Sequence, residues 1–168
     1  RETDQKIVVV DKLTYAGNRA SIERLEAEGR LDLIEADIMD APRMARIVEE
    51  TAPEAIFHLA AETHVDRSID GPAAFVATNV AGTCTMLEAA RAFHDALEGP
   101  QKAAFRFIHV STDEVYGSLG DEGAFRETTP YAPSSPYSAS KAGADHLAHA
   151  WHHTYGLPVI VSNCSNNY

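Results

Sequence analysis

The chain has 168 residues, 45% hydrophobic and 23% charged, proportions that indicate one globular domain and exclude a disordered or fibrous chain. Lys and Arg number 14 against 25 Asp and Glu, so the formal net charge of −11 disfavours binding to the phosphate backbone of nucleic acids. No apolar run approaches the roughly eighteen residues of a membrane span, so we expect a soluble protein with no membrane partner.

Apolar, strand-like runs alternate with helical patterns along the chain. Strands are expected at 6–11, 31–37, 55–60, 105–111 and 157–162. Helices are expected at 21–28, 41–51, 72–96 and 138–155. Asp40 is the expected N-cap of the second helix, and Gly156 followed by Pro158 should end the last one. Near-continuous apolar strands alternating with helices predict the α/β class with a doubly wound parallel sheet, Rossmann-like but incomplete.

Polar residues gather where these strands end. They are Asp11, Asp37, residues 59–63, residues 111–114 and Asn163 onward. In doubly wound sheets ligands bind beyond the carboxyl ends of the strands. The coincidence is the first indication of a binding or catalytic site.

Asp11 closes the first strand. In dinucleotide-binding folds an acid at this place accepts hydrogen bonds from the adenosine ribose hydroxyls and repels a 2′-phosphate. An ordinary strand-end acid would look the same. The glycine-rich phosphate loop that should precede it by about twenty residues is absent. Either the protein binds no dinucleotide, or the first strand and its loop lie outside this chain.

Tyr137 and Lys141 are four residues apart near the start of a helix, which places them on one face. An ammonium beside a phenol lowers the pKa of the phenol, so the tyrosine can act as a general base near neutral pH. A pair on the helix surface has the same spacing and is the alternative interpretation.

Asp113 and Glu114 follow the apolar fourth strand within the segment 111–117. Adjacent carboxylates repel each other, so the pKa of one should be raised, which gives an acid and a base side by side. A solvated turn is the alternative for this segment.

Six segments carry a resemblance that spans essentially the whole chain. They are residues 11–18, 57–68, 78–83, 111–117, 131–141 and 162–168. Together they resemble the extended short-chain dehydrogenase/reductases and, among these, the dTDP-glucose 4,6-dehydratase family. Tyr-x-x-x-Lys marks the superfamily only. Thr-Asp-Glu at 112–114 is more specific, because related epimerases and decarboxylases usually carry other residues there.

The resemblance implies dehydration of dTDP-glucose to a 4-keto-6-deoxy sugar. Tyr137, aided by Lys141, takes the proton of the C4 hydroxyl as hydride passes to NAD. Glu114 then removes the C5 proton, and protonated Asp113 donates to the departing C6 hydroxyl. Hydride returns to C6, which regenerates NAD.

The resemblance also implies binding roles. The cofactor-binding residues are Asp11, Lys12, Leu13 and Thr14 at the adenosine ribose, Asp37 and Ile38 at the adenine, and Leu59, Ala60, Ala61, Thr63, Thr78, Tyr137, Lys141 and Asn167 elsewhere. The substrate-binding residues are Thr63, Thr112 and Asn166, and Thr112 joins Asp113, Glu114, Tyr137 and Lys141 in the catalytic set.

Two departures from the family pattern concern the ends of the chain. No phosphate loop precedes Arg1, and the later part, which forms most of the nucleotide-binding lobe in the family, does not follow Tyr168. We interpret residues 1–168 as a partial NAD-binding domain that carries the catalytic residues. The segment alone should bind NAD poorly and not turn over.

The remaining features concern metals, thiols and assembly. His149 and His153, in a cluster with His146 and His152, have a metal-capable spacing, but no acid completes a site and we expect no metal. Cys84 and Cys164 form neither a disulfide framework nor a zinc pattern, so we expect buried reduced thiols and a cytoplasmic protein. In the family the helices at 72–96 and 138–155 build a dimeric bundle, which implies a homodimer.

Other functions stay open. A UDP-glucose 4,6-dehydratase fits equally, because the base is recognised beyond Tyr168. An epimerase or decarboxylase of the superfamily is disfavoured by the acid–base pair, since epimerisation needs no C5 proton transfer. A non-catalytic nucleotide-sugar-binding module has no physical reason to keep all five reacting groups. The product could feed rhamnose or another deoxysugar.

Overall fold

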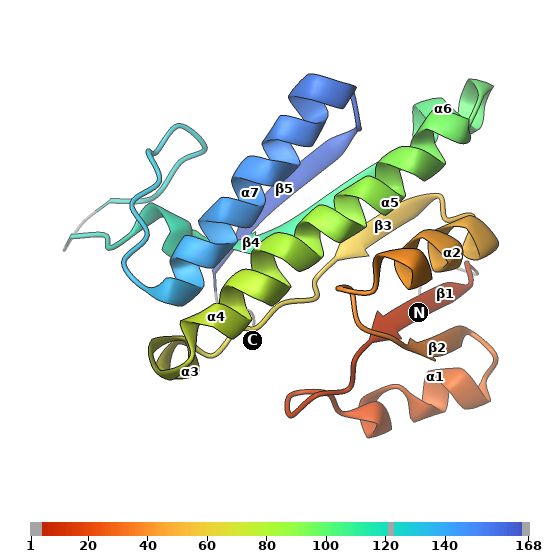
Figure 1. The fold of residues 1–168 in the computed structure, drawn as a ribbon, viewed down its shortest axis with the longest axis horizontal. Helices are drawn as coiled ribbons and strands as arrows, with labels where there is room; N and C mark the ends of the chain where they lie inside the picture. Colours follow the sequence, from red (N-terminus) through yellow and green to blue (C-terminus); the bar gives the residue numbers. More distant parts are fainter. Residues whose placement is uncertain (1–4, 121–122, 166–168) are drawn as a thin grey trace.

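Two parallel sheets form the frame of the molecule (Figure 1). The computed structural model describes residues 5–120 and 123–165. One sheet pairs β1 (Ile7–Asp11) with β2 (Leu31–Glu35), and the other has the order β3 (Ala55–His58), β4 (Arg106–Thr112), β5 (Val159–Cys164). All pairings are parallel, so the predicted α/β class is confirmed. Within the described ranges β1 and β3 do not pair, and the strands therefore divide into two sheets.

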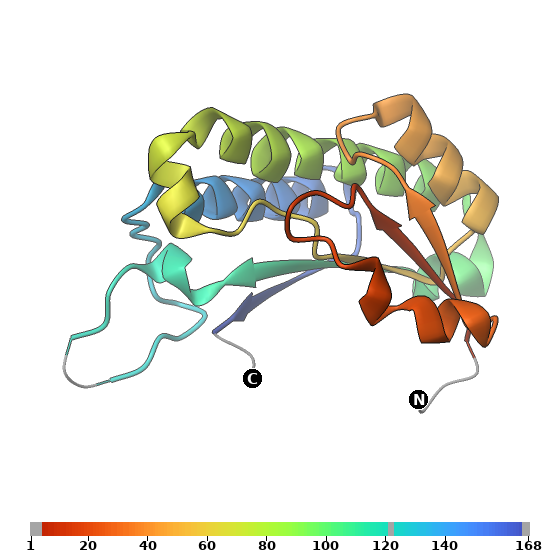
Figure 2. The ribbon, with the colours of Figure 1, turned by 90° about the horizontal axis from the view of Figure 1, so that it is seen from below.

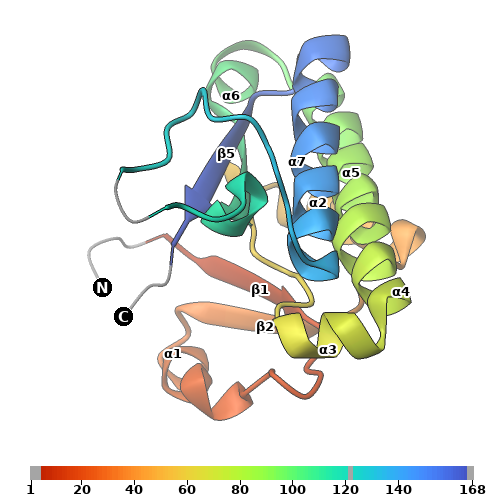
Figure 3. The ribbon, with the colours of Figure 1, turned by 90° about the vertical axis from the view of Figure 1, so that its left-hand side faces the viewer.

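The helices are distributed unequally over the two faces (Figure 2). The long helices lie on one face and are α2 (Ala41–Thr51), α5 (Thr83–Ala96) and α7 (Pro136–Tyr155). The 3₁₀ helix η1 (Arg19–Ser21) and α1 (Glu23–Ala27) lie on the other, beside the first sheet. Viewed from the end, α5 and α7 run side by side along the second sheet (Figure 3).

The region expected as one helix over 72–96 has three parts. It comprises α4 (Pro72–Phe75), a π-helical segment η2 (Val76–Gly82) and α5. The short helices α3 (Val65–Asp70) and α6 (Gly99–Ala104) were not expected from the pattern. Both are too short to give a helical period in the sequence, and α6 starts directly at Gly99-Pro100.

Capping residues mark three helix ends: the start of α2 and the end of α7 are as predicted, whereas α7 starts at Pro136, two residues earlier than predicted. The side chain of Asp40 accepts a hydrogen bond from the Arg43 amide at 3.0 Å and starts α2. Ser135 and Ser138 form a capping box that starts α7. Gly156, with φ of 72°, ends α7 in the left-handed conformation that favours glycine.

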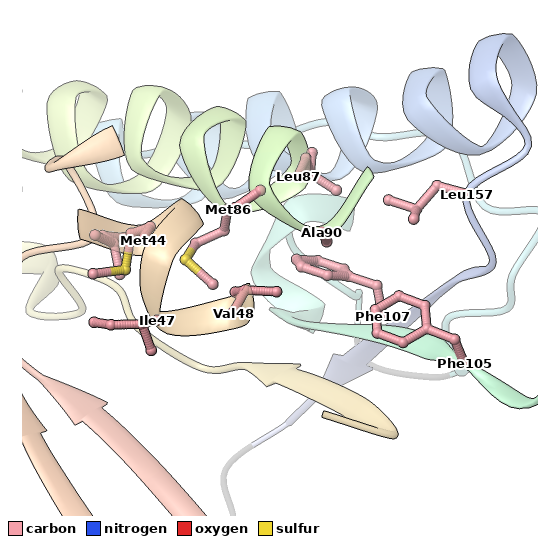
Figure 4. Packing of buried hydrophobic residues seen from close by; sticks show 11 residues of the cluster. Met44, Ile47, Val48, Met86, Leu87, Ala90, Phe105, Phe107 and Leu157 are labelled. Carbon is pink, nitrogen blue, oxygen red and sulfur yellow. The ribbon is translucent and has the colours of Figure 1, made fainter. Parts of the chain in front are cut away.

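The hydrophobic core lies between the helical layer and the sheets (Figure 4). Its buried members include Met44, Ile47, Val48, Met86, Leu87, Ala90, Phe105, Phe107 and Leu157. Cys84 and Cys164 are free thiols that are half-buried rather than fully buried as expected. No helix in the described part of the chain has the length and apolar character to cross a membrane.

The opposite face of the second sheet is apolar and partly bare. Phe57, Ile108 and Ile160 occupy one register row across β3, β4 and β5. They alternate with the neighbouring row that contains buried Phe107, so they point away from α5 and α7. Phe57 is 66% exposed and Ile160 48% exposed.

Candidate active site

The carboxyl end of β4 turns directly into the 3₁₀ helix η3 (Asp113–Tyr116). Thr112 is its N-cap: the hydroxyl accepts a hydrogen bond from the Glu114 amide at 3.3 Å and donates to Asp113 Oδ1 at 3.4 Å. Thr112 is buried, Asp113 half-buried and Glu114 exposed. The segment is therefore a 3₁₀-helical turn that has both carboxyl groups in its first turn, and Glu114 is exposed to solvent.

Tyr137 and Lys141 lie in the first two turns of α7 and are buried, at 9% and 4% exposure. The Tyr137 amide donates to Ser68 Oγ of α3 at 3.2 Å. Lys141 Nζ donates to the carbonyl oxygen of Val110, in β4, at 2.8 Å. The alternative of a pair on the helix surface is therefore wrong.

The electrostatic surroundings of this pair are dominated by burial. Burial raises the pKa of Tyr137, a hydrogen bond with Thr112 opposes the rise, and the nearby carboxyl groups add to it. Burial lowers the pKa of Lys141, and Asp145 opposes that shift. The lowered phenol pKa expected from the spacing is thus not found in this chain.

One member of the adjacent acid pair has a raised pKa, as the sequence suggests. It is Glu114: partial burial of its carboxyl group raises the pKa first, and the charge of Asp113 raises it further. A carboxylate with a raised pKa is a stronger base once ionised. This direction suits the role of base that the family resemblance gives to Glu114.

The ends of β1 and β2 meet through an ion pair. Lys12 Nζ lies 2.5 Å from Asp37 Oδ2, and the Met39 amide donates to Asp37 Oδ1 at 2.9 Å. Burial alone would raise the pKa of Asp37, but the bonds from Lys12 and Met39 bring it below its ordinary value. The carboxylate of Asp11 accepts from the Leu13 amide at 2.6 Å. Two expected cofactor-binding segments are thus adjacent.

The loop after β3 is held by a buried asparagine. Asn79 Oδ1 accepts from the Glu62 amide at 2.8 Å, while its Nδ2 donates to the Glu62 carbonyl at 3.0 Å and to Ser140 Oγ at 2.9 Å. The loop holds the expected cofactor residues Leu59 and Thr63, both exposed, and Ala60 and Ala61, both half-buried. It is therefore fixed to η2 and to α7, the helix of Tyr137 and Lys141.

The two sheets are joined at this same end of the molecule by Tyr15. Its hydroxyl donates to Glu62 Oε2 at 2.8 Å, and the guanidinium of Arg67 lies 3.6 Å from the centre of its ring. The loop that follows β1 therefore contacts the loop that follows β3. Tyr15, Glu62 and Arg67 were not selected from the sequence.

Other expected residues lie around this end. Thr78 is half-buried in η2, and buried Ile38 packs against Gly82, where an added Cβ would come within 2.6 Å of Ile38 Cδ1. Asn166 and Asn167, the expected substrate and cofactor residues, lie outside the described residues. Leu13 and Thr14 follow β1, half-buried and exposed.

Sequence reasoning missed the buried polar residues that support the site. Asn79, Ser140 and Asp145 are fully or almost fully buried. The signal that could have found them is their polarity at inward positions of otherwise apolar helices, because a buried polar group must be hydrogen-bonded. His149 and His153 are exposed on α7, and in the ranges 5–120 and 123–165 no three potential ligands converge as a metal site.

Comparisons with known proteins point to one family. The family model described as GDP-mannose 4,6 dehydratase matches residues 2–168. The dTDP-glucose 4,6-dehydratase 1 of Escherichia coli K12 is 58% identical over 99% of this chain and 48% of its own length. The dTDP-glucose 4,6-dehydratase of Xanthomonas campestris pv. campestris strain B100 is 56% identical over 97% of this chain and 46% of its own.

A solved structure agrees with these sequence matches. DesIV, a dTDP-glucose 4,6-dehydratase of Streptomyces venezuelae solved with NAD bound, has a TM-score of 0.87 and 47% identity. The superposition covers 99% of this chain and 48% of DesIV. The chain thus spans about half the length of the curated relatives it matches.

Proposed function

The chain belongs to the family described as GDP-mannose 4,6 dehydratase, and on that premise we propose that the full-length protein is a dTDP-glucose 4,6-dehydratase. It removes water from dTDP-glucose to give the 4-keto-6-deoxy sugar. The observation that carries the proposal is the position of the five candidate catalytic residues on two elements that are in contact. Thr112, Asp113 and Glu114 end β4, and Tyr137 and Lys141 are buried on the helix that β4 contacts through the Val110 carbonyl. Identity above 55% to proteins of that name supports the choice of substrate.

The residues at the strand ends fit a dinucleotide. Asp11 is an exposed carboxylate at the carboxyl end of β1, the chemistry that accepts hydrogen bonds from ribose hydroxyls. Because Gly82 has no side chain, Ile38 can pack directly against it; an added Cβ would lie 2.6 Å from Ile38 Cδ1. The residues that would hold NAD are Asp11, Lys12, Leu13, Thr14, Asp37, Ile38, Leu59, Ala60, Ala61, Thr63, Thr78, Tyr137 and Lys141. When bound, NAD supplies a reversible hydride acceptor.

The chain's own residues then move three protons. Tyr137, as the phenolate that the ammonium of Lys141 stabilises, takes the proton of the sugar C4 hydroxyl and becomes the neutral phenol. The C4 ketone acidifies the neighbouring C5–H, which Glu114 removes. Asp113, in its protonated form, donates to the C6 hydroxyl as the C6–O bond breaks and water leaves. Thr112 bonds the sugar near C4, and Thr63 also contacts the substrate.

Domain organisation, assembly and location belong to the same proposal. Residues 1–168 are the part of an NAD-binding domain that carries the catalytic residues, and the rest of the full-length protein forms the nucleotide-binding lobe. α5 and α7, which run side by side on the outer layer, are the proposed faces of a homodimer (Figure 3). Two free thiols, that of Cys84 with a pKa raised mainly by burial, suit a cytoplasmic protein.

The test offers dTDP-glucose and UDP-glucose separately to the full-length protein with NAD and measures product mass. We expect loss of one water from the dTDP sugar. Asp113→Asn and Glu114→Gln, which keep side-chain size, should each abolish it. Water loss from UDP-glucose alone would correct the base, and unchanged mass with both sugars would contradict the dehydratase function.

A further inference from the structure

A buried carboxylate that the reaction does not use lies one helical turn beyond Lys141. Asp145, on α7, has no exposed surface and accepts hydrogen bonds from four donors. The donors are His109 Nε2 at 2.9 Å, Ser111 Oγ at 2.8 Å, Tyr131 OH at 2.9 Å and Asn163 Nδ2 at 3.4 Å. All four hydrogen bonds that the structure gives to the Asp145 carboxyl group are ones that it accepts.

Asp145 and Lys141 between them bind three consecutive residues of β4. Lys141 Nζ binds the carbonyl oxygen of Val110, and Asp145 binds the side chains of His109 and Ser111, the residues on either side. The two helix residues are four apart, so they lie on one face. Together they fix the register between α7 and β4 immediately before Thr112.

The same carboxylate also reaches the acid–base segment. Asn163 of β5 donates to Asp145 and accepts at Oδ1 from the hydroxyl of Tyr116 at 3.1 Å. Tyr116 is the last residue of η3, the turn that carries Asp113 and Glu114. The rings of Tyr116 and Tyr131 are in contact, with centroids 5.2 Å apart. Asp145 is therefore linked to both halves of the candidate site.

We propose that Asp145 is a positioning residue of the active site, whose buried charge keeps the Lys141 ammonium protonated and whose four hydrogen bonds hold α7 against β4 and η3. The inference rests on the proposed function, because it assigns a task to the Tyr137–Lys141 pair. A charged ammonium that is buried without a nearby anion loses its proton readily. Asp145 acts against that loss.

Other titratable groups surround the pair and set the background on which Asp145 acts. Around Asp145 and Lys141 these groups are His58 on β3, His109 on β4, Asp113, Glu114 and Tyr116 on η3, Tyr131 in the loop before α7, and Tyr137 on α7 itself. Asp145 differs from the other two carboxyl groups in being fully buried.

The test compares Asp145→Asn with Tyr131→Phe in the full-length protein with NAD, as pH profiles of water loss from dTDP-glucose. Without the charge of Asp145, Lys141 deprotonates at lower pH. The alkaline limb of kcat should therefore move down by about one pH unit, and kcat at pH values above both limbs should be roughly tenfold lower than in the wild type, with little change in KM. Tyr131→Phe removes one donor and leaves the charge, so its alkaline limb should stay in place.

An alkaline limb that stays in place in folded Asp145→Asn would overturn the proposal. If that variant does not fold, the double variant Ser111→Ala/Tyr131→Phe tests the positioning role, because it keeps the charge and removes two donors. The kcat of this double variant should fall roughly threefold or more, and a kcat equal to that of the wild type would contradict the positioning role of Asp145.

A double-mutant cycle that measures stability, not activity, tests this inference separately from the proposed function. It compares the denaturant midpoints of Lys141→Met, Asp145→Asn and the double variant. The loss in the double variant should be smaller than the summed single losses, because neither charge is then left buried alone. Additive losses would overturn the proposed coupling, whatever sugar the enzyme takes. An inactive wild-type enzyme with coupled midpoints would overturn the proposed function alone.

Discussion

At the end of β4 two consecutive carboxyl groups have different surroundings. Asp113 is half-buried and accepts a hydrogen bond from Thr112, whereas Glu114 belongs to the exposed side of η3 with its carboxyl group only partly covered. Partial burial and the charge of Asp113 raise the pKa of Glu114. The raised pKa makes Glu114, once ionised, a stronger base than an ordinary glutamate.

The acid limb of catalysis should reflect Glu114. The base must be ionised, so activity is lost as pH falls through its raised pKa. We expect the acid limb of kcat in the full-length protein to lie above 4.5, the ordinary value for glutamate. The measurement is the rate of water loss from dTDP-glucose between about pH 4 and about pH 7. An acid limb below 4.5 would show that another group limits the rate.

His58 makes folding sensitive to acid. Burial, followed by the charges of His109 and Lys141, lowers its pKa from 6.5 to about 3, and its Nε2 lies 2.9 Å from Thr83 Oγ1. The unfolded chain binds the proton below pH 6.5 and the folded chain does not. Stability is therefore complete above that pH and is lost as pH falls toward 3, by about 1.4 kcal/mol per unit.

His58→Gln cannot titrate and keeps a polar group toward Thr83. Between about pH 7.5 and about pH 5, the wild-type full-length protein should lose about 2 kcal/mol more unfolding free energy than the variant. Denaturant titrations at the two pH values measure the difference. Parallel losses in both proteins would mean that His58 is protonated in the folded state.

At the scale of elements, the position of η3 depends on the glycine that ends it. Gly117 has φ of 88°, and a Cβ there would lie 2.6 Å from the carbonyl oxygen of Ala132, a main-chain atom. The Ala132 amide in turn donates to the Val115 carbonyl at 2.9 Å. The loop before α7 thus packs directly on the turn that carries the acid–base pair.

Gly117→Ala should destabilise the full-length protein by about 2 kcal/mol and lower kcat, because η3 must shift to relieve both the strain and the collision. Gly120→Ala is the matched control, since a Cβ there meets nothing within 4 Å. Thermal melts and product assays of the two variants give the comparison. Equal behaviour of the two would contradict the packing described for Gly117.

The sequence predicts those elements whose local signals agree. α2 has the predicted bounds because Asp40 caps it, and α7 ends at Gly156 as expected. The π-helical segment around Asn79 was not predicted. The Asn79 side chain is hydrogen-bonded to the main chain of Glu62, 17 residues away, and a local sequence pattern does not contain such a partner. The contacts of Asp145 join residues up to 36 positions apart, and no local pattern contains them. The candidate catalytic residues were found because they lie at strand and helix ends.

At the scale of the whole molecule, the two sheets are covered unequally. The row of Phe57, Ile108 and Ile160 faces away from α5 and α7 and is partly exposed. Parallel sheets are normally covered on both faces. The curated relatives that the chain matches are about twice its length.

The 168-residue segment alone should therefore bind NAD poorly, bind a hydrophobic dye at the bare face and release no product. Calorimetric titration of the segment with NAD, beside the full-length protein as control, is the measurement. Micromolar NAD binding by the segment would contradict this expectation, because it would mean that these residues form a complete cofactor site.

In the proposed reaction the site removes a proton from C5 and the hydroxyl group from C6, which together make the one water that is lost. The most direct test incubates the full-length protein with NAD and dTDP-glucose in deuterated water and measures product mass. In the proposed mechanism Glu114 takes the C5 proton, and C5 regains a proton from solvent as hydride returns to C6, so we predict a product that has lost one water and gained one deuterium at C5. A sugar with neither change, whether recovered intact or epimerised at C4, would contradict the account.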